Sequence, residues 1–213
     1  MTMKFTSIAK GQLTQSIAKM LFDKAGYRVT RLGIEELFSE VIHLDQKQYL
    51  ELELPENLRS LPDLLIATKE MTCAKLIEVK FRSSFNEASA KGLYDILSKQ
   101  FKCWPNTVCM LMISKSPING GRFHQDYIRI VDKSNLRYLD SSRWDTSAQT
   151  SKEPDLVQHM ITNQFKVDGA SGIWVQLKKL SDEFSLFGHK TTDTWMSADL
   201  ITQTLSDLQK LEE

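Results

Sequence analysis

Residues 76–81 read Leu-Ile-Glu-Val-Lys-Phe and place two charges within an otherwise apolar segment. Successive side chains of a β-strand point to opposite faces, so Glu78 and Lys80 would share one face, ~7 Å apart. The apolar residues between and beside them would take the other face and belong to the core. Charged residues are rarely buried unless they are paired, so this strand predicts a site on its charged face.

A second short apolar segment precedes this strand. Residues 63–67 (DLLIA) and 76–81 are separated by the polar stretch 68–72 (TKEMT), which predicts an antiparallel hairpin. If the turn centres between residues 70 and 71, Asp63 lies directly opposite Glu78. Directly opposed residues have Cβ atoms ~5 Å apart.

Two carboxylates at this separation repel each other unless a cation lies between them. The oxygens of Asp63 and Glu78, together with the backbone carbonyl of Val79, suit a hard cation such as Mg²⁺ or Mn²⁺. Lys80 beside them would hold or activate a water molecule, the attacking group in phosphodiester hydrolysis. The charged face therefore predicts a metal site for phosphate chemistry.

The segments on either side predict an α/β fold. Apolar residues at helical spacing predict a helix over residues 7–25 that ends at Gly26, and Ser84 with Glu87 forms a capping-box signature for a helix that reaches Lys102. Its apolar side would carry Leu93, Ile96, Leu97 and Phe101. Strands are expected over residues 27–32, 50–54, 107–113 and 127–131, and a helix over 34–44. The strand–helix–strand order implies a right-handed crossover onto a mixed sheet.

The signal changes after residue 131, where the chain becomes polar and irregular. We therefore expect a core over residues 1–131 and a C-terminal extension over residues 132–213. Within the extension, Pro154 predicts the start of a helix to Phe165, and residues 173–177 a further strand. A final amphipathic helix from Ser197 carries Leu200, Ile201, Leu205, Leu208 and Leu211. The extension could pack on the core or form a homodimer.

The order Pro62-Asp63, fourteen residues, then Glu78-Val79-Lys80 resembles the PD-(D/E)XK nuclease superfamily. That superfamily includes Holliday-junction resolvases and many restriction enzymes, and the resemblance covers roughly residues 7–114. It implies a restriction-endonuclease-like mixed sheet flanked by helices, and Mg²⁺- or Mn²⁺-dependent hydrolysis of DNA phosphodiester bonds. Asp63 and Glu78 would be the metal ligands, and Lys80 would activate water or stabilise the transition state.

The first helix departs from the family's pattern. The family often has a glutamate there that reaches into the site, whereas this sequence has Gln15, with Gln12 as the nearby alternative. An amide can ligate or orient water but adds no charge, so Gln15 is expected to play an accessory polar role. Polar residues of the helix after the motif reach the site in some relatives, and Lys99 or Gln100 would do so here.

Basic residues follow the motif along the chain. Arg82, Lys91, Lys99 and Lys102 would contact phosphates if they line one rim of the site. The alternative, equally open, is that they are ordinary solvated residues on a helix surface.

The composition excludes several classes of protein. Hydrophobic residues make up 41% and charged residues 25% of the chain, which is globular composition. No apolar run approaches the ~20 residues that span a bilayer, and no signal peptide is evident, so a cytoplasmic protein without a membrane partner is expected. Three cysteines without a C-x-x-C pair and four scattered histidines indicate neither a disulfide framework nor a zinc site.

A net charge of zero leaves two functions open. The chain could be an active deoxyribonuclease, or it could be a catalytically inactive protein of the same fold that binds nucleic acid or another protein. Proteins that coat nucleic acid usually carry a basic balance. A basic groove around the motif would favour the nuclease, and a neutral or acidic one the binding module.

Overall fold

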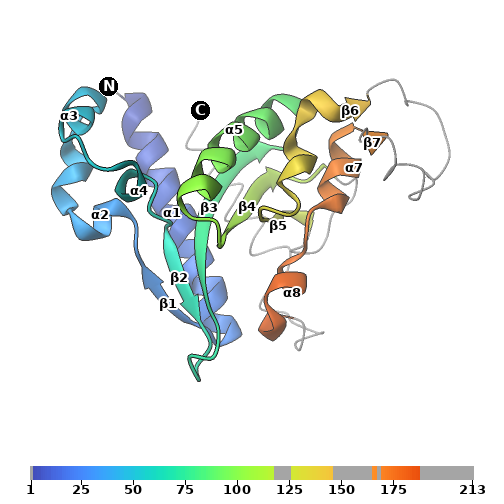
Figure 1. The fold of residues 1–213 in the computed structure, drawn as a ribbon, viewed down its shortest axis with the longest axis horizontal. Helices are drawn as coiled ribbons and strands as arrows, with labels where there is room; N and C mark the ends of the chain where they lie inside the picture. The colour runs from blue at the N-terminus through green and yellow to red at the C-terminus, as the bar shows by residue number, and fades with distance from the viewer. Residues whose placement is uncertain (1, 118–125, 146–164, 167–168, 188–213) are drawn as a thin grey trace.

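The computed structural model describes residues 2–117, 126–145, 165–166 and 169–187. Its centre is a five-stranded sheet in the order β1-β2-β3-β4-β5 (Figure 1). The strands are β1 (Arg28–Arg31), β2 (Leu64–Ala67), β3 (Ala74–Ser84), β4 (Thr107–Lys115) and β5 (Ile128–Val131). β3 and β4 are parallel and the other neighbours are antiparallel, so the sheet is mixed, as predicted.

The hairpin of β2 and β3 has the predicted register. Leu64 pairs with Ile77 and Ala67 with Ala74, which is the pairing that follows from a turn centred between residues 70 and 71. Met71, at the turn, has a φ of 54° in the left-handed region. Asp63 directly precedes β2, at the position that would continue this pairing opposite Glu78.

Helices cover both faces of the sheet (Figure 1). One apolar cluster joins α1 (Thr2–Ala25) and α8 (Leu180–Glu183) to one face, and a second joins α5 (Glu87–Cys103) and α7 (Gly169–Gln176) to the other. β4 is buried on both sides because alternate residues enter the two clusters, Met110 in the first and Leu111 in the second. The described part of the chain thus has a three-layer α/β fold, with the sheet between two layers of helices.

The two main helices form where the sequence predicts them, with different details at their ends. α1 ends at Ala25, and Gly26 follows with a φ of 101°, so the predicted stop is confirmed. α5 is capped by Asn86, whose side chain and that of Ser89 form a reciprocal capping box, so the predicted cap at Ser84 is wrong. Ile96 is 43% exposed and does not join the apolar side of α5.

Two other expectations in the first half need correction. The strand predicted over residues 50–54 is wrong, because α3 (Gln46–Glu51) is a helix capped by Asp45 and Gln48; the alternating leucines run across its end. The helix predicted over residues 34–44 is divided into a short α2 (Ile34–Leu37) and the 3-10 turn η1 (Ser39–His43). A further short helix, α4 (Glu56–Arg59), leads into the hairpin.

The strand predicted over residues 173–177 is also wrong. This segment belongs to α7, where Ile173, Trp174 and Leu177 are buried at helical spacing and Val175 is exposed. Short apolar runs of this length do not distinguish a strand from a buried helix. The helix predicted from Pro154 lies outside the described residues except at Phe165, which pairs as part of β7 (Phe165–Lys166) with β6 (Trp144–Asp145). The predicted helix from Ser197 also lies outside them.

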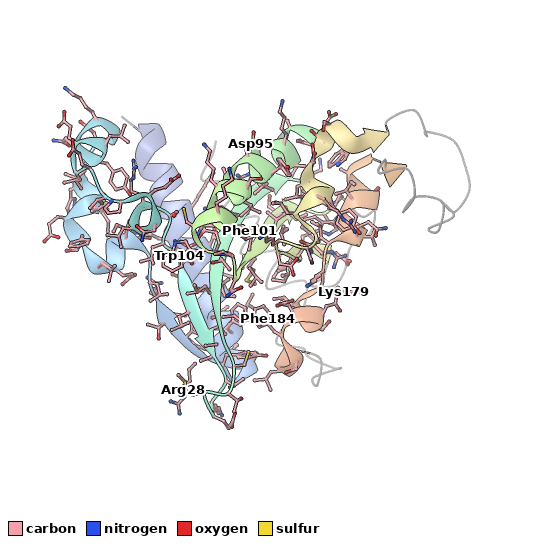
Figure 2. The ribbon with its side chains drawn as sticks, in the orientation of Figure 1. Arg28, Asp95, Phe101, Trp104, Lys179 and Phe184 are labelled. Carbon is pink, nitrogen blue, oxygen red and sulfur yellow. The ribbon has the colours of Figure 1, made fainter. Side chains whose placement is uncertain are left out.

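The described part of the C-terminal extension packs on the sheet. Leu139 of the 3-10 turn η3 (Leu136–Leu139) and Trp174 join the α5 cluster, while Leu180 and Phe184 join the α1 cluster. Figure 2 shows Phe184 at the end of α8, beside the strands. Within the ranges described, no helix has both the length and the apolar character needed to cross a membrane. The boundary at residue 131 stays a prediction.

Replacing Trp174 by alanine tests this packing. Trp174 is fully buried and its ring lies 5.1 Å from that of Phe85. We expect Trp174→Ala to lower the free energy of unfolding by about 3–5 kcal/mol, measured by urea denaturation. Val175→Ala is the matched control, because the neighbouring side chain is 59% exposed. Equal effects of the two variants would contradict the burial of α7 on the core.

Candidate active site

The motif residues meet on the α5 side of the sheet. Glu78 and Lys80 of β3 pair with Cys109 and Leu111 of β4, which belong to the α5 cluster. They lie in an open pocket of about 530 Å³. Its lining consists of Ile34, Glu35, Glu56, Arg59, Ser60, Leu61, Asp63, Glu78, Lys80, Asp95, Ile96, Lys99 and Gln100. Segments around α2, α4, the hairpin and α5 therefore enclose one site.

Asp63 is fixed by contacts on both carboxylate oxygens. Its Oδ2 accepts a hydrogen bond from the backbone N–H of Val79 at 2.7 Å, and its Oδ1 accepts one from Gln15 Nε2 at 2.7 Å. Its own carbonyl accepts a bond from the N–H of Leu32 at 2.8 Å. These contacts join α1, β3 and the residue that follows β1 to a single acid.

The pKa of Asp63 is raised to about 7, first by burial and then by the charge of Glu78. Lys80 and the hydrogen bond from Val79 oppose this rise without cancelling it. A carboxyl group whose pKa lies near neutrality, next to a second acid, is a frequent mark of a functional site.

Glu78 is 6% exposed and has partners on both oxygens. Its Oε1 forms an ion pair with the ammonium of Lys80, and its Oε2 accepts a hydrogen bond from Gln100 Nε2 at 3.2 Å. Burial raises the pKa of Glu78, although the charge of Lys80 opposes it. Burial lowers the pKa of Lys80, but the charges of Glu78 and Asp63 outweigh it, so the net direction is upward and the side chain is an ammonium.

Gln100 and α4 form the wall opposite the strands. Gln100 Nε2 also donates to the carbonyl of Ser60 at 2.7 Å, and Trp104 Nε1 donates to that of Asn57 at 3.1 Å. Figure 2 shows Trp104 at the end of α5, on the side of α4. The expectation that Lys99 or Gln100 reaches the site is met by both, since Lys99 lines the pocket and Gln100 contacts Glu78.

Gln15 lies in the site as expected, and it leads to an acid that the motif does not contain. Besides Asp63, its Nε2 contacts Glu35 Oε1 at 3.5 Å. Glu35 belongs to α2 and lines the pocket. In the sequence Glu35 looks no different from Glu36, which is exposed and paired with Arg31. Only the path of the chain after β1 distinguishes the two.

The four basic residues proposed for phosphate contact lie in different surroundings. Lys99 lines the pocket, and Lys91 and Lys102 are exposed on α5. Arg82 is half-buried and donates to the carbonyl of Phe81 at 2.7 Å, and burial lowers its pKa. The structure thus brings Lys99 to the site, and leaves Arg82 engaged with the backbone.

The pocket has an acidic surplus, because five acidic and three basic side chains line it. The basic ones are Arg59, Lys80 and Lys99. A groove of this charge does not match the basic surface that would favour a nuclease over a binding module. A bound divalent cation would remove the surplus.

The donor set fits a hard divalent cation. Asp63 and Glu78 offer carboxylate oxygens, and each oxygen retains a lone pair beyond the hydrogen bond it accepts. Oxygen donors of this kind suit Mg²⁺ or Mn²⁺. In the described parts of the chain, no three His, Cys, Asp or Glu side chains are grouped so as to hold a metal ion together. Two carboxylates are enough for Mg²⁺, which keeps several waters.

No protein-family model matches the chain, and neither a curated protein nor a solved structure gives a significant match. The resemblance to PD-(D/E)XK nucleases therefore rests on the motif and on the elements that carry it.

Substitution of Asp63 by asparagine should reveal the raised pKa as a pH-dependent stability. In the unfolded chain the pKa of an aspartate is about 3.9, so the folded state favours the protonated acid. The stabilisation that this preference gives is complete only below pH ~4. It is lost as the pH rises through about 7. In the presence of a chelator, we compare the free energy of unfolding of Asp63→Asn with that of the unsubstituted chain. Raising the pH from 5 to 8 should shift this difference in favour of the variant by on the order of 1–2 kcal/mol.

Urea denaturation at both pH values measures this difference. Asp95→Asn is the control, because it removes an exposed carboxylate from the same pocket. If the difference between Asp63→Asn and the unsubstituted chain is the same at both pH values, the assignment of a raised pKa to Asp63 is wrong.

Proposed function

We propose that the chain is a metal-dependent nuclease that hydrolyses phosphodiester bonds in DNA. The observation that carries this proposal is that Asp63, Glu78 and Lys80 line one pocket, where the register of β2 and β3 brings the two acids together. The resemblance to the PD-(D/E)XK superfamily supports the same conclusion. Fold class alone would not, since one fold serves many functions.

Asp63 and Glu78 would bind Mg²⁺ or Mn²⁺, together with the backbone carbonyl of Val79. Such an ion, when bound, neutralises phosphate charge and acidifies water. The protein's part is to keep the two carboxylates in place: Gln15 and the N–H of Val79 orient Asp63, while Gln100 and Lys80 orient Glu78. Each carboxylate is therefore preorganised by donors on both oxygens.

Lys80 would supply positive charge at the scissile phosphate. Its ammonium is paired with Glu78 by one donor and has further N–H donors for a phosphate oxygen or for the attacking water. Hydrolysis breaks the bond between phosphorus and the leaving oxygen while charge builds up on the phosphate oxygens. A fixed cation at that point stabilises the transition state more than the ground state.

The substrate would approach over α5. Lys99 lines the pocket, and Lys91 and Lys102 are exposed on the same helix at spacings that place them on one face with it. Phosphate contacts of this type make binding dependent on salt and independent of sequence. DNA is preferred as the substrate because the resembled family acts mostly on DNA.

The acidic pocket and Gln15 favour a second candidate, a catalytically inactive protein of this fold that binds nucleic acid or another protein. An acidic groove repels a phosphate backbone unless a cation is bound. A homodimer through the C-terminal helix also stays a prediction, since that helix lies outside the described residues.

Cleavage of supercoiled plasmid and of linear duplex DNA separates the two candidates. The nuclease proposal predicts cutting with Mg²⁺ or Mn²⁺ and none with a chelator. Asp63→Ala and Lys80→Ala should each reduce the rate by at least about 100-fold, since they remove groups that act on the transition state.

Lys69→Ala is the matched control, because it removes an exposed lysine in the hairpin turn. Absence of cutting by the unsubstituted chain under every metal condition would favour the binding module. Cutting that persists in Asp63→Ala would show that the activity comes from elsewhere.

A further inference from the structure

Glu35 is a carboxylate that the motif does not explain. It follows β1 in the short helix α2, lines the pocket together with Asp63 and Glu78, and also lines a neighbouring pocket of about 290 Å³ with Gln12 and Gln15. Its negative charge contributes to the raised pKa of both motif acids. It is therefore close enough to act on the same site.

Gly33 makes room for this carboxylate. It is buried at the start of α2, and a Cβ atom built there would lie 2.8 Å from Cδ, Oε1 and Oε2 of Glu35. The φ of Gly33 is −38°, so its backbone does not require the left-handed conformation that favours glycine. The absent side chain serves the approach of Glu35 rather than a turn.

The opposite side of Glu35 is closed by Gln15. One amide nitrogen contacts Glu35 at 3.5 Å and Asp63 at 2.7 Å, so it lies between two acids and can give one hydrogen to each. The backbone is tied to the same place, because the N–H of Leu32, next to Gly33, donates to the carbonyl of Asp63. Glu35 is thus positioned from both sides and from the main chain.

We infer that Glu35 is the outer carboxylate of the cation site, with Gly33 as the residue that positions it. This inference rests on the proposed function. Because Gln15 separates Glu35 from Asp63, Glu35 would accept hydrogen bonds from the waters that Mg²⁺ or Mn²⁺ retains rather than bind the ion itself. It supplies the negative charge that Gln15 lacks.

Isothermal titration of the 213-residue chain with Mn²⁺ tests the inference without relying on activity. Glu35→Gln should weaken Mn²⁺ binding by about tenfold, as is usual for partners of metal ligands. Glu56→Gln is the matched control, because Glu56 lines the same pocket but, unlike Glu35, is not among the main causes of the raised pKa of either motif acid. An equal loss in both variants would overturn the inference in favour of a general effect of pocket charge.

Gly33→Ala gives a second and independent test. The added Cβ would displace the end of the flexible Glu35 side chain, so Mn²⁺ binding should weaken while the melting temperature changes little. In a Glu35→Ala background the same substitution should have no effect on Mn²⁺ binding, since no carboxylate is left to displace. Additive losses would show that Gly33 acts through something other than Glu35.

Mn²⁺ binding distinguishes a failure of the proposed metal site from a failure of the role inferred for Glu35. If the unsubstituted chain binds no Mn²⁺, both the metal site and the role of Glu35 are wrong. If it binds Mn²⁺ and Asp63→Ala abolishes this binding while Glu35→Gln leaves it unchanged, the metal site stands and the inference about Glu35 is wrong.

Discussion

Asp63 and Glu78 lie next to each other in a largely buried place, and two carboxylates there cannot both be charged without compensation. The contacts around them supply it in part: Lys80 provides a positive charge, and Gln15, Gln100 and the N–H of Val79 provide neutral donors. These partners come from α1, β3 and α5, so the helical layers on both sides of the sheet take part in one electrostatic arrangement. Burial and then the charge of Glu78 raise the pKa of Asp63 to about 7, so these partners do not fully offset the cost of charging both acids.

The sheet could be predicted from the sequence because strands have a period of two and a hairpin has one register for each turn position. Asp63 and Glu78 were expected to face each other for this reason, and the observed pairing of Leu64 with Ile77 confirms the register. The strands predicted over residues 50–54 and 173–177 are wrong because short apolar patterns do not distinguish a strand from a helix. The capping box of Asp45 and Gln48 begins α3, and this local interaction favours a helix over the strand that the alternating leucines indicate.

The site was predictable only as far as its motif. Gln15 was identified through a family pattern, and Gln100 as one of two candidates, and both contact the motif acids. Glu35 could not be found in this way, because its place depends on the turn at Gly33 and on the path of the chain from β1 to α2. This acid also gives a physical reason for the amide at position 15. A glutamate there would set a further carboxylate against both Asp63 and Glu35, with no hydrogen to donate to either.

The proposed function depends on whether a divalent cation binds between the motif acids. The most direct measurement is an anomalous diffraction map from a crystal of the 213-residue chain soaked in Mn²⁺. A nuclease site predicts a peak in contact with carboxylate oxygens of both Asp63 and Glu78, with Glu35 on its water shell. A map without a peak at these acids, in which Asp63 stays bonded to Gln15 and Glu78 to Lys80, would contradict it. The pair would then be a neutralised structural element, and the pocket a surface for binding rather than for hydrolysis.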